Sequence, residues 1–251
     1  MEPFKILVFD SGKGGLNVLF RLKESFPDID FYYLSDSENA PYGILSRKEL
    51  FSLAKSCLEP FIDDFSAIIL ACNTLTVNCL STLENHFEKP FLGVRPDLNV
   101  KSGKNLLICT AATKKATEAD FFCGENLTVV APKGWVESLE EEPFPENFSF
   151  FEKSLPKESF DCVFAGCTHF IFLSDFLKNF YYPAKISDGT APLIAELSLF
   201  LQKTVGRTAT AATVTEITQK NFLGDDKTCN FVTFSKLKDL KTHKCSKIFK
   251  K

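Results

Sequence analysis

The stretch Ala67-Ile-Ile-Leu-Ala-Cys72-Asn-Thr74 decides the fold class of this chain. Its apolar run is short and rich in branched residues, which fits a strand buried on both faces of a parallel sheet, and a cysteine follows where the strand ends. The same arrangement returns in Cys162-Val-Phe-Ala-Gly-Cys167-Thr-His169, whose strand-end cysteine lies 95 positions after the first. Two buried strands that each end at a cysteine indicate two similar α/β units.

Other strand-like stretches support this internal repeat. Two of them precede each cysteine-ended strand in the same order, at residues 5–9 and 29–34 in the first half and at residues 105–109 and 127–131 in the second. A helical pattern at residues 16–25 follows the first strand. Because strands that alternate with helices form parallel sheets, and because an internal repeat sets the architecture, we predict two pseudo-symmetric α/β half-domains with mainly parallel sheets. We place residues 1–97, completed by 206–251, in the first half-domain and residues 98–205 in the second.

Composition excludes several classes of protein. Hydrophobic residues make up 45% of the 251 residues and charged residues 24%, which is ordinary for a globular protein. The net charge of −3 argues against a nucleic-acid partner, and no apolar run approaches the ~20 residues of a membrane span. The first residues lead directly into a strand without the features of a signal peptide, and the nine cysteines include no Cys-x-x-Cys pair. We therefore expect a cytoplasmic protein with free thiols and no membrane partner.

Two polar segments are predicted to lie outside the core. Residues 140–150 are acidic and interrupted by proline, which is typical of a loop. Residues 236–251 are rich in lysine with three apolar positions. A solvated helix face is the simpler interpretation of that pattern, and contact with an anionic surface is the alternative.

The two strand-end cysteines carry the chemistry that the sequence indicates. Ligands of open α/β sheets bind beyond the carboxyl ends of the strands, and a cysteine placed there before a helix has its thiolate favoured by backbone N–H groups and the helix dipole. A single buried cysteine is usually a small core residue, and we interpret seven of the nine in that way: Cys57, Cys79, Cys109, Cys123, Cys162, Cys229 and Cys245. That interpretation does not explain why Cys72 and Cys167 occupy equivalent places in two halves.

Each cysteine has a titratable candidate partner nearby. Asp10 ends the first strand and is expected at the same sheet edge as Cys72, although an aspartate there commonly caps the following helix instead. His169 follows Cys167 by two residues and has an ordinary pKa near neutrality. The glycine-rich turn Ser11-Gly-Lys-Gly-Gly15 offers N–H groups to an anion or simply tightens the strand–helix junction, and it matches neither a dinucleotide fingerprint nor a P-loop. The three histidines are far apart, so we predict no metal site.

These motifs together resemble the glutamate racemases of the aspartate/glutamate racemase superfamily. The matching stretches follow the order of that family: Phe9-Asp-Ser-Gly-Lys-Gly-Gly15, Asp36 with Pro41-Tyr42-Gly43, Ala71-Cys-Asn-Thr74 and Gly166-Cys-Thr-His-Phe170, with weaker matches at Thr110-Ala-Ala-Thr113, Ser187-Asp-Gly189 and Gly224-Asp225. The resemblance implies flavodoxin-like half-domains that face each other across a cleft, a homodimer, and a supply of D-glutamate for peptidoglycan. It implies no cofactor and no metal.

The resemblance also implies the role of each site residue. One thiolate removes the α-proton of glutamate while the other thiol returns a proton to the opposite face, with Asp10 adjusting Cys72 and His169 adjusting Cys167. Glu137 is our choice for the acidic residue of the second half, and Glu140 is the alternative. Substrate contacts are implied for Asp10, Ser11, Tyr42, Gly43, Asn73, Thr74, Thr113 and Thr168.

Some residues depart from the family pattern, and other functions stay open at this stage. Cys109 replaces the usual glycine before the Thr-x-x-Thr stretch, and Arg95 stands where the family has an apolar residue. The alternatives are a racemase of the same superfamily acting on aspartate or a related acid, a thiol enzyme with one nucleophilic cysteine, and a non-catalytic amino-acid-binding protein. One methylene alters a pocket too little to separate glutamate from aspartate by sequence alone.

Overall fold

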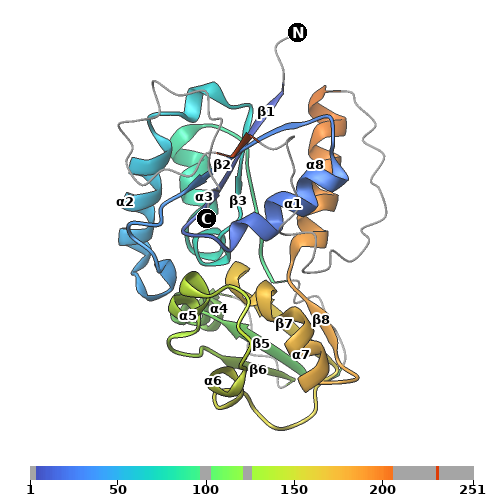
Figure 1. The fold of residues 1–251 in the computed structure, drawn as a ribbon. Coiled ribbons are helices and arrows are strands. Elements are labelled where there is room, and N and C mark those ends of the chain that lie inside the picture. The colour runs from blue at the N-terminus through green and yellow to red at the C-terminus, as the bar shows by residue number, and fades with distance from the viewer. Residues whose placement is uncertain (1–3, 97–102, 121–125, 206–229, 232–251) are drawn as a thin grey trace.

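The computed structural model describes residues 4–96, 103–120, 126–205 and 230–231, and it contains two parallel sheets (Figure 1). The first sheet has the strand order β4-β3-β1-β2-β9 and the second β6-β5-β7-β8. The strands of the first sheet are β1 (Lys5–Asp10), β2 (Asp30–Ser35), β3 (Ala67–Leu70), β4 (Phe91–Gly93) and β9 (Asn230–Phe231). Those of the second are β5 (Asn105–Cys109), β6 (Leu127–Val130), β7 (Cys162–Gly166) and β8 (Lys185–Ser187).

The internal repeat predicted from the sequence is confirmed by the topology. In each half, the first strand of the repeat lies in the middle, with the second strand on one side and the cysteine-ended third strand on the other, so β2-β1-β3 corresponds to β6-β5-β7. All of these pairs are parallel. The prediction of an α/β fold with two pseudo-symmetric parallel sheets is therefore correct.

Helices cover the sheets and carry the site residues. The α-helices are α1 (Gly15–Ser25), α2 (Arg47–Leu58), α3 (Asn73–Phe87), α4 (Ala111–Asp120), α5 (Trp135–Glu141), α6 (Ser149–Glu152), α7 (Ser174–Phe180) and α8 (Thr190–Val205). The described residues also form short 3₁₀ helices, namely η1 (Tyr42–Ile44), η2 (Ile62–Asp64) and η3 (Thr168–Leu173). None of the helices that the structure describes is long and apolar enough to cross a membrane.

The predicted loop at residues 140–150 is wrong at both ends. Helix α5 continues through Glu141, and α6 begins at Ser149. The acidic composition is overridden by packing, because Trp135, Leu139 and Phe151 are fully buried in the core of the second half. Residues 236–251, which we predict to be a solvated helix face, lie outside the described residues.

Two cores flank the first sheet, and the later part of the chain contributes to one of them. Helices α2 and α3 pack on one face, while α1 and α8 pack on the other, where Leu193 and Leu197 of α8 join Leu16 and Leu19 of α1. Helix α8 thus contacts the first core although it belongs to the segment 98–205. The division of the chain at residues 97 and 205 stays a prediction.

Candidate active site

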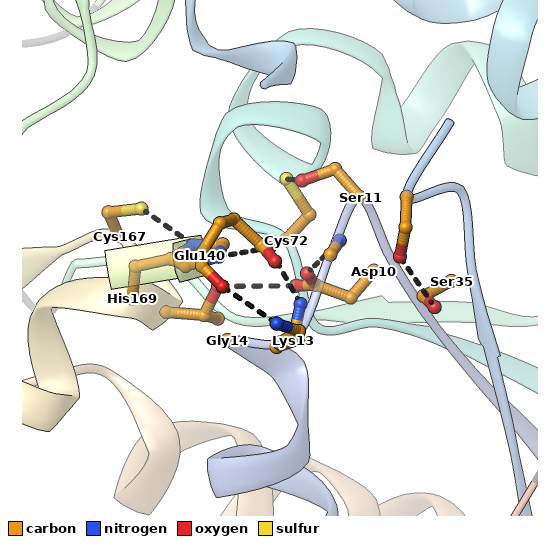
Figure 2. A network of polar contacts seen from close by, with 12 residues as sticks. Asp10, Ser11, Lys13, Gly14, Ser35, Cys72, Glu140, Cys167 and His169 are labelled. Carbon is orange, nitrogen blue, oxygen red and sulfur yellow. Dashed lines mark hydrogen bonds and ion pairs between the residues drawn. The ribbon is translucent and has the colours of Figure 1, made fainter. Parts of the chain in front are cut away.

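The carboxyl ends of the central strands bring the predicted cysteines into one buried cluster. Asp10 is the last residue of β1, Cys72 lies immediately before α3, and Cys167 lies between β7 and η3. The exposed fraction is 5% for Cys72 and 6% for Cys167. Figure 2 shows both thiols beside the same network of polar contacts, which also contains His169.

The first half surrounds Cys72 with a buried carboxyl group and a hydroxyl group. Asp10 is fully buried, and its carboxylate accepts hydrogen bonds from the Gly12 N–H at 2.8 Å and from the Thr168 hydroxyl at 3.2 Å. The Ser11 Oγ lies 3.6 Å from the Cys72 sulfur. Asp10 therefore does not cap α1, which begins at Gly15 without a side-chain cap. Its partners come from the turn and from the second half instead.

Burial raises the pKa of both Asp10 and Cys72, which favours their neutral forms. Burial raises the pKa of Asp10 to about 6, against the opposing effects of His169 and the Gly12 N–H. Burial, together with the charge of Asp10, raises the pKa of Cys72 to about 12. At neutral pH Cys72 is therefore a thiol, able to donate a proton.

The second half gives Cys167 a charged partner. His169 lies with Nδ1 3.8 Å from the Cys167 sulfur and Nε2 2.5 Å from Glu140 Oε1. Burial alone would lower the pKa of His169, but its hydrogen bonds to Cys167 and Glu140 outweigh burial and raise that pKa to about 10. Burial alone would raise the pKa of Glu140, but its hydrogen bonds and charge interactions with His169 and Lys13 together outweigh burial and lower that pKa. At neutral pH the pair is an imidazolium and a carboxylate.

Of the two acidic residues considered from the sequence, the structure places Glu140, the alternative, at the second half-site, and it does not place Glu137, our choice, there. Glu137 is exposed, whereas Glu140 contacts His169. The rotation of α5 causes this difference, since Trp135 and Leu139 point into the core and Trp135 packs edge-on against Phe170 of η3 at 5.2 Å.

The other predicted substrate residues line the same interface between the halves. Tyr42 is buried and donates a hydrogen bond from its hydroxyl to Asp36 Oδ2 at 2.6 Å. A Cβ placed on Gly43 would lie 2.7 Å from Thr110 Cβ, so the absence of a side chain there permits close approach of the halves. Asn73 is 1% exposed, and both polar atoms of its amide lack a partner. A buried amide with both groups free can bind a polar ligand.

Two residues of the cluster have no counterpart in our sequence predictions. Thr110 lies between Thr74 and Thr113, with hydroxyl distances of 2.9 Å and 3.0 Å, and it links α3 to the start of α4. Lys13 donates to Glu140 from its backbone N–H. Thr110 belongs to the stretch Thr110-Ala-Ala-Thr113, which matches the family only weakly and indicates no role for it. Nothing in the sequence of the glycine-rich turn singles out Lys13. Among the described residues, no group of three or more His, Cys, Asp or Glu side chains is arranged to hold a metal ion.

Comparisons with known proteins add a second kind of observation. No protein-family model matches the chain. The glutamate racemase of Campylobacter curvus is 32% identical over 223 residues, which cover 77% of this chain and 83% of that protein. The solved glutamate racemase of Campylobacter jejuni matches 95% of both chains with a TM-score of 0.71 and 25% identity. The Escherichia coli glutamate racemase, solved with L-glutamate and the activator UDP-MurNAc-Ala, has a TM-score of 0.68 and 25% identity over 80% of this chain and 83% of its own.

Proposed function

We propose that this chain, which belongs to the glutamate racemase family and is therefore an amino-acid racemase, interconverts L- and D-glutamate by proton transfer between two thiols. The observation that carries the mechanism is the pair of buried thiols, Cys72 and Cys167, which come from opposite halves and have unequal partners. A racemase with two bases needs one group on each face of the α-carbon. It also needs one of them ionised while the other holds a proton.

The unequal partners supply that difference in charge. The imidazolium of His169 stabilises negative charge on the sulfur of Cys167. Cys72 stays a neutral thiol because burial and Asp10 disfavour its thiolate. We therefore assign the first base to Cys167, the thiol that faces an imidazolium, and the first acid to Cys72. After Cys167 has taken the α-proton and Cys72 has given its proton to the opposite face, the roles are reversed, which suits the enzyme for the opposite enantiomer.

Removal of an α-proton also requires donors for the charge that develops on the substrate carboxylate. The unpartnered Asn73 amide is suited to this, because preorganised donors in a buried site stabilise such charge without reorganisation. The remaining contacts to the substrate would come from residues at the interface between the halves, most of which carry hydroxyl groups: Ser11, Tyr42, Gly43, Thr74, Thr113 and Thr168. Asp10 and His169 act on the two thiols, and Glu140 holds His169.

The choice of glutamate rests on the family and on a relative. The E. coli racemase was solved with L-glutamate, and this chain matches it over most of its length. We further propose a cytoplasmic homodimer that supplies D-glutamate for peptidoglycan. The reaction as written uses only side chains of this protein. Light scattering after gel filtration tests the dimer.

The decisive experiment follows α-proton exchange. Purified, reduced protein is incubated with L-glutamate in deuterium oxide without added cofactor, and α-deuterium and D-glutamate are measured by NMR and chiral chromatography. Both should appear for the wild type, and racemisation should be lost in Cys72→Ala and in Cys167→Ala. Cys162→Ala is the matched control, because Cys162 is buried at the other end of the strand that leads to Cys167.

Three outcomes would contradict the proposal. Absence of exchange from either enantiomer in folded wild-type protein would refute the glutamate assignment. Faster racemisation of aspartate under the same conditions would favour the other branch of the superfamily. Loss of activity in only one of the two cysteine variants would point to a single nucleophile.

A further inference from the structure

Lys13 connects the two halves of the molecule at the site. It lies in the turn between β1 and α1, on the first half, while Glu140 lies on α5 of the second half. The backbone N–H of Lys13 donates to Glu140 Oε1 at 2.8 Å, and its side-chain Nζ donates to the Glu140 carbonyl at 2.7 Å. Figure 2 shows Lys13 and Glu140 beside each other, joined by a dashed line, in the network that also contains His169.

The two contacts fix both ends of Glu140. The carboxylate oxygen that accepts from the Lys13 N–H is the same atom that faces His169 Nε2. The carbonyl that accepts from the Lys13 Nζ lies in the last turn of α5, where helix carbonyls lack partners within the helix and a cation is favoured by the dipole. A single residue thus holds the main chain and the side chain of Glu140.

The turn itself leaves room for Glu140. A Cβ placed on Gly12 would lie 1.8 Å from Glu140 Oε1, so any larger residue at this position would expel the carboxylate. This close approach is independent of the lysine side chain. The turn therefore accommodates Glu140 through the shape of its backbone as well as through the charge of Lys13.

We propose that Lys13 is a positioning residue that reaches across the interface between the half-domains and holds Glu140 against His169, so that the Cys167 side of the site is complete only when the halves are together. This inference rests on the proposed function. Because both thiols are buried, the halves must separate to admit a substrate. The contacts between Lys13 and Glu140 would then break and form again in each catalytic cycle.

The test compares Lys13→Met with Lys13→Arg and with Lys48→Met. Methionine keeps the length of the side chain but removes its donor and charge, arginine keeps both, and Lys48 is an exposed lysine near the start of α2. We expect kcat/KM to fall about tenfold or less in Lys13→Met, because the backbone contact to Glu140 remains. Arginine should restore most of the activity, and Lys48→Met should match the wild type.

Titration of His169 separates a positioning role from a simple loss of charge. The chain has three histidines, so NMR of histidine-labelled protein can follow His169 directly. Loss of a nearby cation alone would raise the pKa of His169. Loss of the hold on Glu140 would lower it, because the bond to Glu140 is one cause of its raised value. We expect the titration midpoint to fall in Lys13→Met and to return in Lys13→Arg.

A double variant completes the test. If Lys13 acts through Glu140, Lys13→Met added to Glu140→Gln should reduce activity no further than Glu140→Gln alone. A midpoint for His169 that rises or stays unchanged in Lys13→Met would overturn the proposal, as would additive losses in the double variant. The titration needs no turnover, so an inactive wild type would refute the proposed function without deciding the role of Lys13.

Discussion

At the scale of single residues, the two thiols have similar burial but very different partners. Cys72 has a hydroxyl group and a carboxyl group near it, whereas Cys167 faces an imidazolium that is itself paired with Glu140. Two equal thiols could not hold one proton in a defined place. In the proposed two-thiol mechanism, the difference between Asp10 and His169 decides which thiol begins as the base.

The first prediction compares two glutamates of one helix. Glu140→Gln should lower kcat/KM at least about tenfold, because the amide cannot stabilise the imidazolium of His169 as a carboxylate does. Glu137→Gln should leave kcat/KM unchanged, because Glu137 is exposed three residues earlier on α5. Steady-state racemisation of both variants checks this. Equal loss in the two variants would contradict this role for Glu140.

The second prediction concerns the stability of the fold as a function of pH. The folded pKa of Asp10 is about 6, above its ordinary 3.8, so the folded state holds the proton more tightly than the unfolded state. Stability is consequently lost as pH rises from about 4 through about 6, by about 3 kcal/mol at most. Asp10→Asn, which cannot ionise, should unfold several degrees higher than the wild type above that window while losing racemase activity.

Thermal unfolding across a pH series measures this directly. The advantage of Asp10→Asn should shrink as pH falls below about 6 and disappear well below pH 3.8, where Asp10 is neutral in both folded and unfolded wild type. A variant that is less stable than the wild type at neutral pH would show that the carboxylate of Asp10 stabilises the fold through its bonds to Gly12 and Thr168.

Sequence alone could identify the residues that adjoin strands but not those that reach the site from elsewhere. Cys72, Cys167 and Asp10 follow recognisable strands, so their meeting at the sheet edges follows from topology. Glu140 depends on the rotation of α5, which is set by the burial of Trp135 and by its contact with Phe170. No local pattern records that rotation, and the sequence left Glu137 and Glu140 as alternatives.

At the scale of elements, the longer strands were predictable and the shortest strands were not. All six predicted strands are present, with ends that differ from the prediction by no more than one residue. Strands β4 and β8 have three residues each and were missed, because so short a segment shows no periodicity. The same limit applies to η3, whose six buried residues place His169 but have no pattern that distinguishes a 3₁₀ helix.

The third prediction tests the packing of α1 against η3. A Cβ on Gly14 would lie 2.5 Å from Thr168 Oγ1 and 2.7 Å from the His169 nitrogen of the backbone. Gly14→Ala should lower kcat/KM about a hundredfold, because a shift of about 1 Å misplaces the reacting groups. Circular dichroism should stay unchanged, because the backbone of Gly14 has a φ of −58° and a ψ of −35°, which alanine adopts without strain.

Glu24→Ala provides the control for that variant. Glu24 is exposed near the end of the same helix, so its replacement should leave kcat/KM at the value of the wild type. Wild-type activity in Gly14→Ala would mean that η3 can move away from α1 without harm. The position of Thr168 and His169 would then not depend on this contact.

At the scale of the whole molecule, the chain crosses between the halves twice, and the two crossings lie close together. The backbone at Arg95 follows β4 of the first sheet, and Gly189 lies between β8 of the second sheet and α8 on the first core. The ion pair between Arg21 of α1 and Asp188 lies beside this second crossing. The proposed separation of the halves would bend the chain at these two points, so the packing there affects the contacts across the interface.

The last prediction concerns Gly189 at that point. Its φ is +78°, and a Cβ there would lie 2.1 Å from the Arg95 carbonyl oxygen, so Gly189→Ala introduces both backbone strain and a clash with a main chain. Gly134→Ala is the matched control, because φ there is +77° but the nearest atom, at 3.2 Å, belongs to the Phe150 ring. Both variants share the cost of about 1–2 kcal/mol for a left-handed alanine. Only Gly189→Ala must in addition displace the main chain at Arg95, so the Tm of this variant should fall several degrees further than that of Gly134→Ala. Equal Tm values for the two variants would show that the main chain at Arg95 and at Gly189 can move apart without loss of stability. The interface between the halves would then be held by the contacts of the site alone.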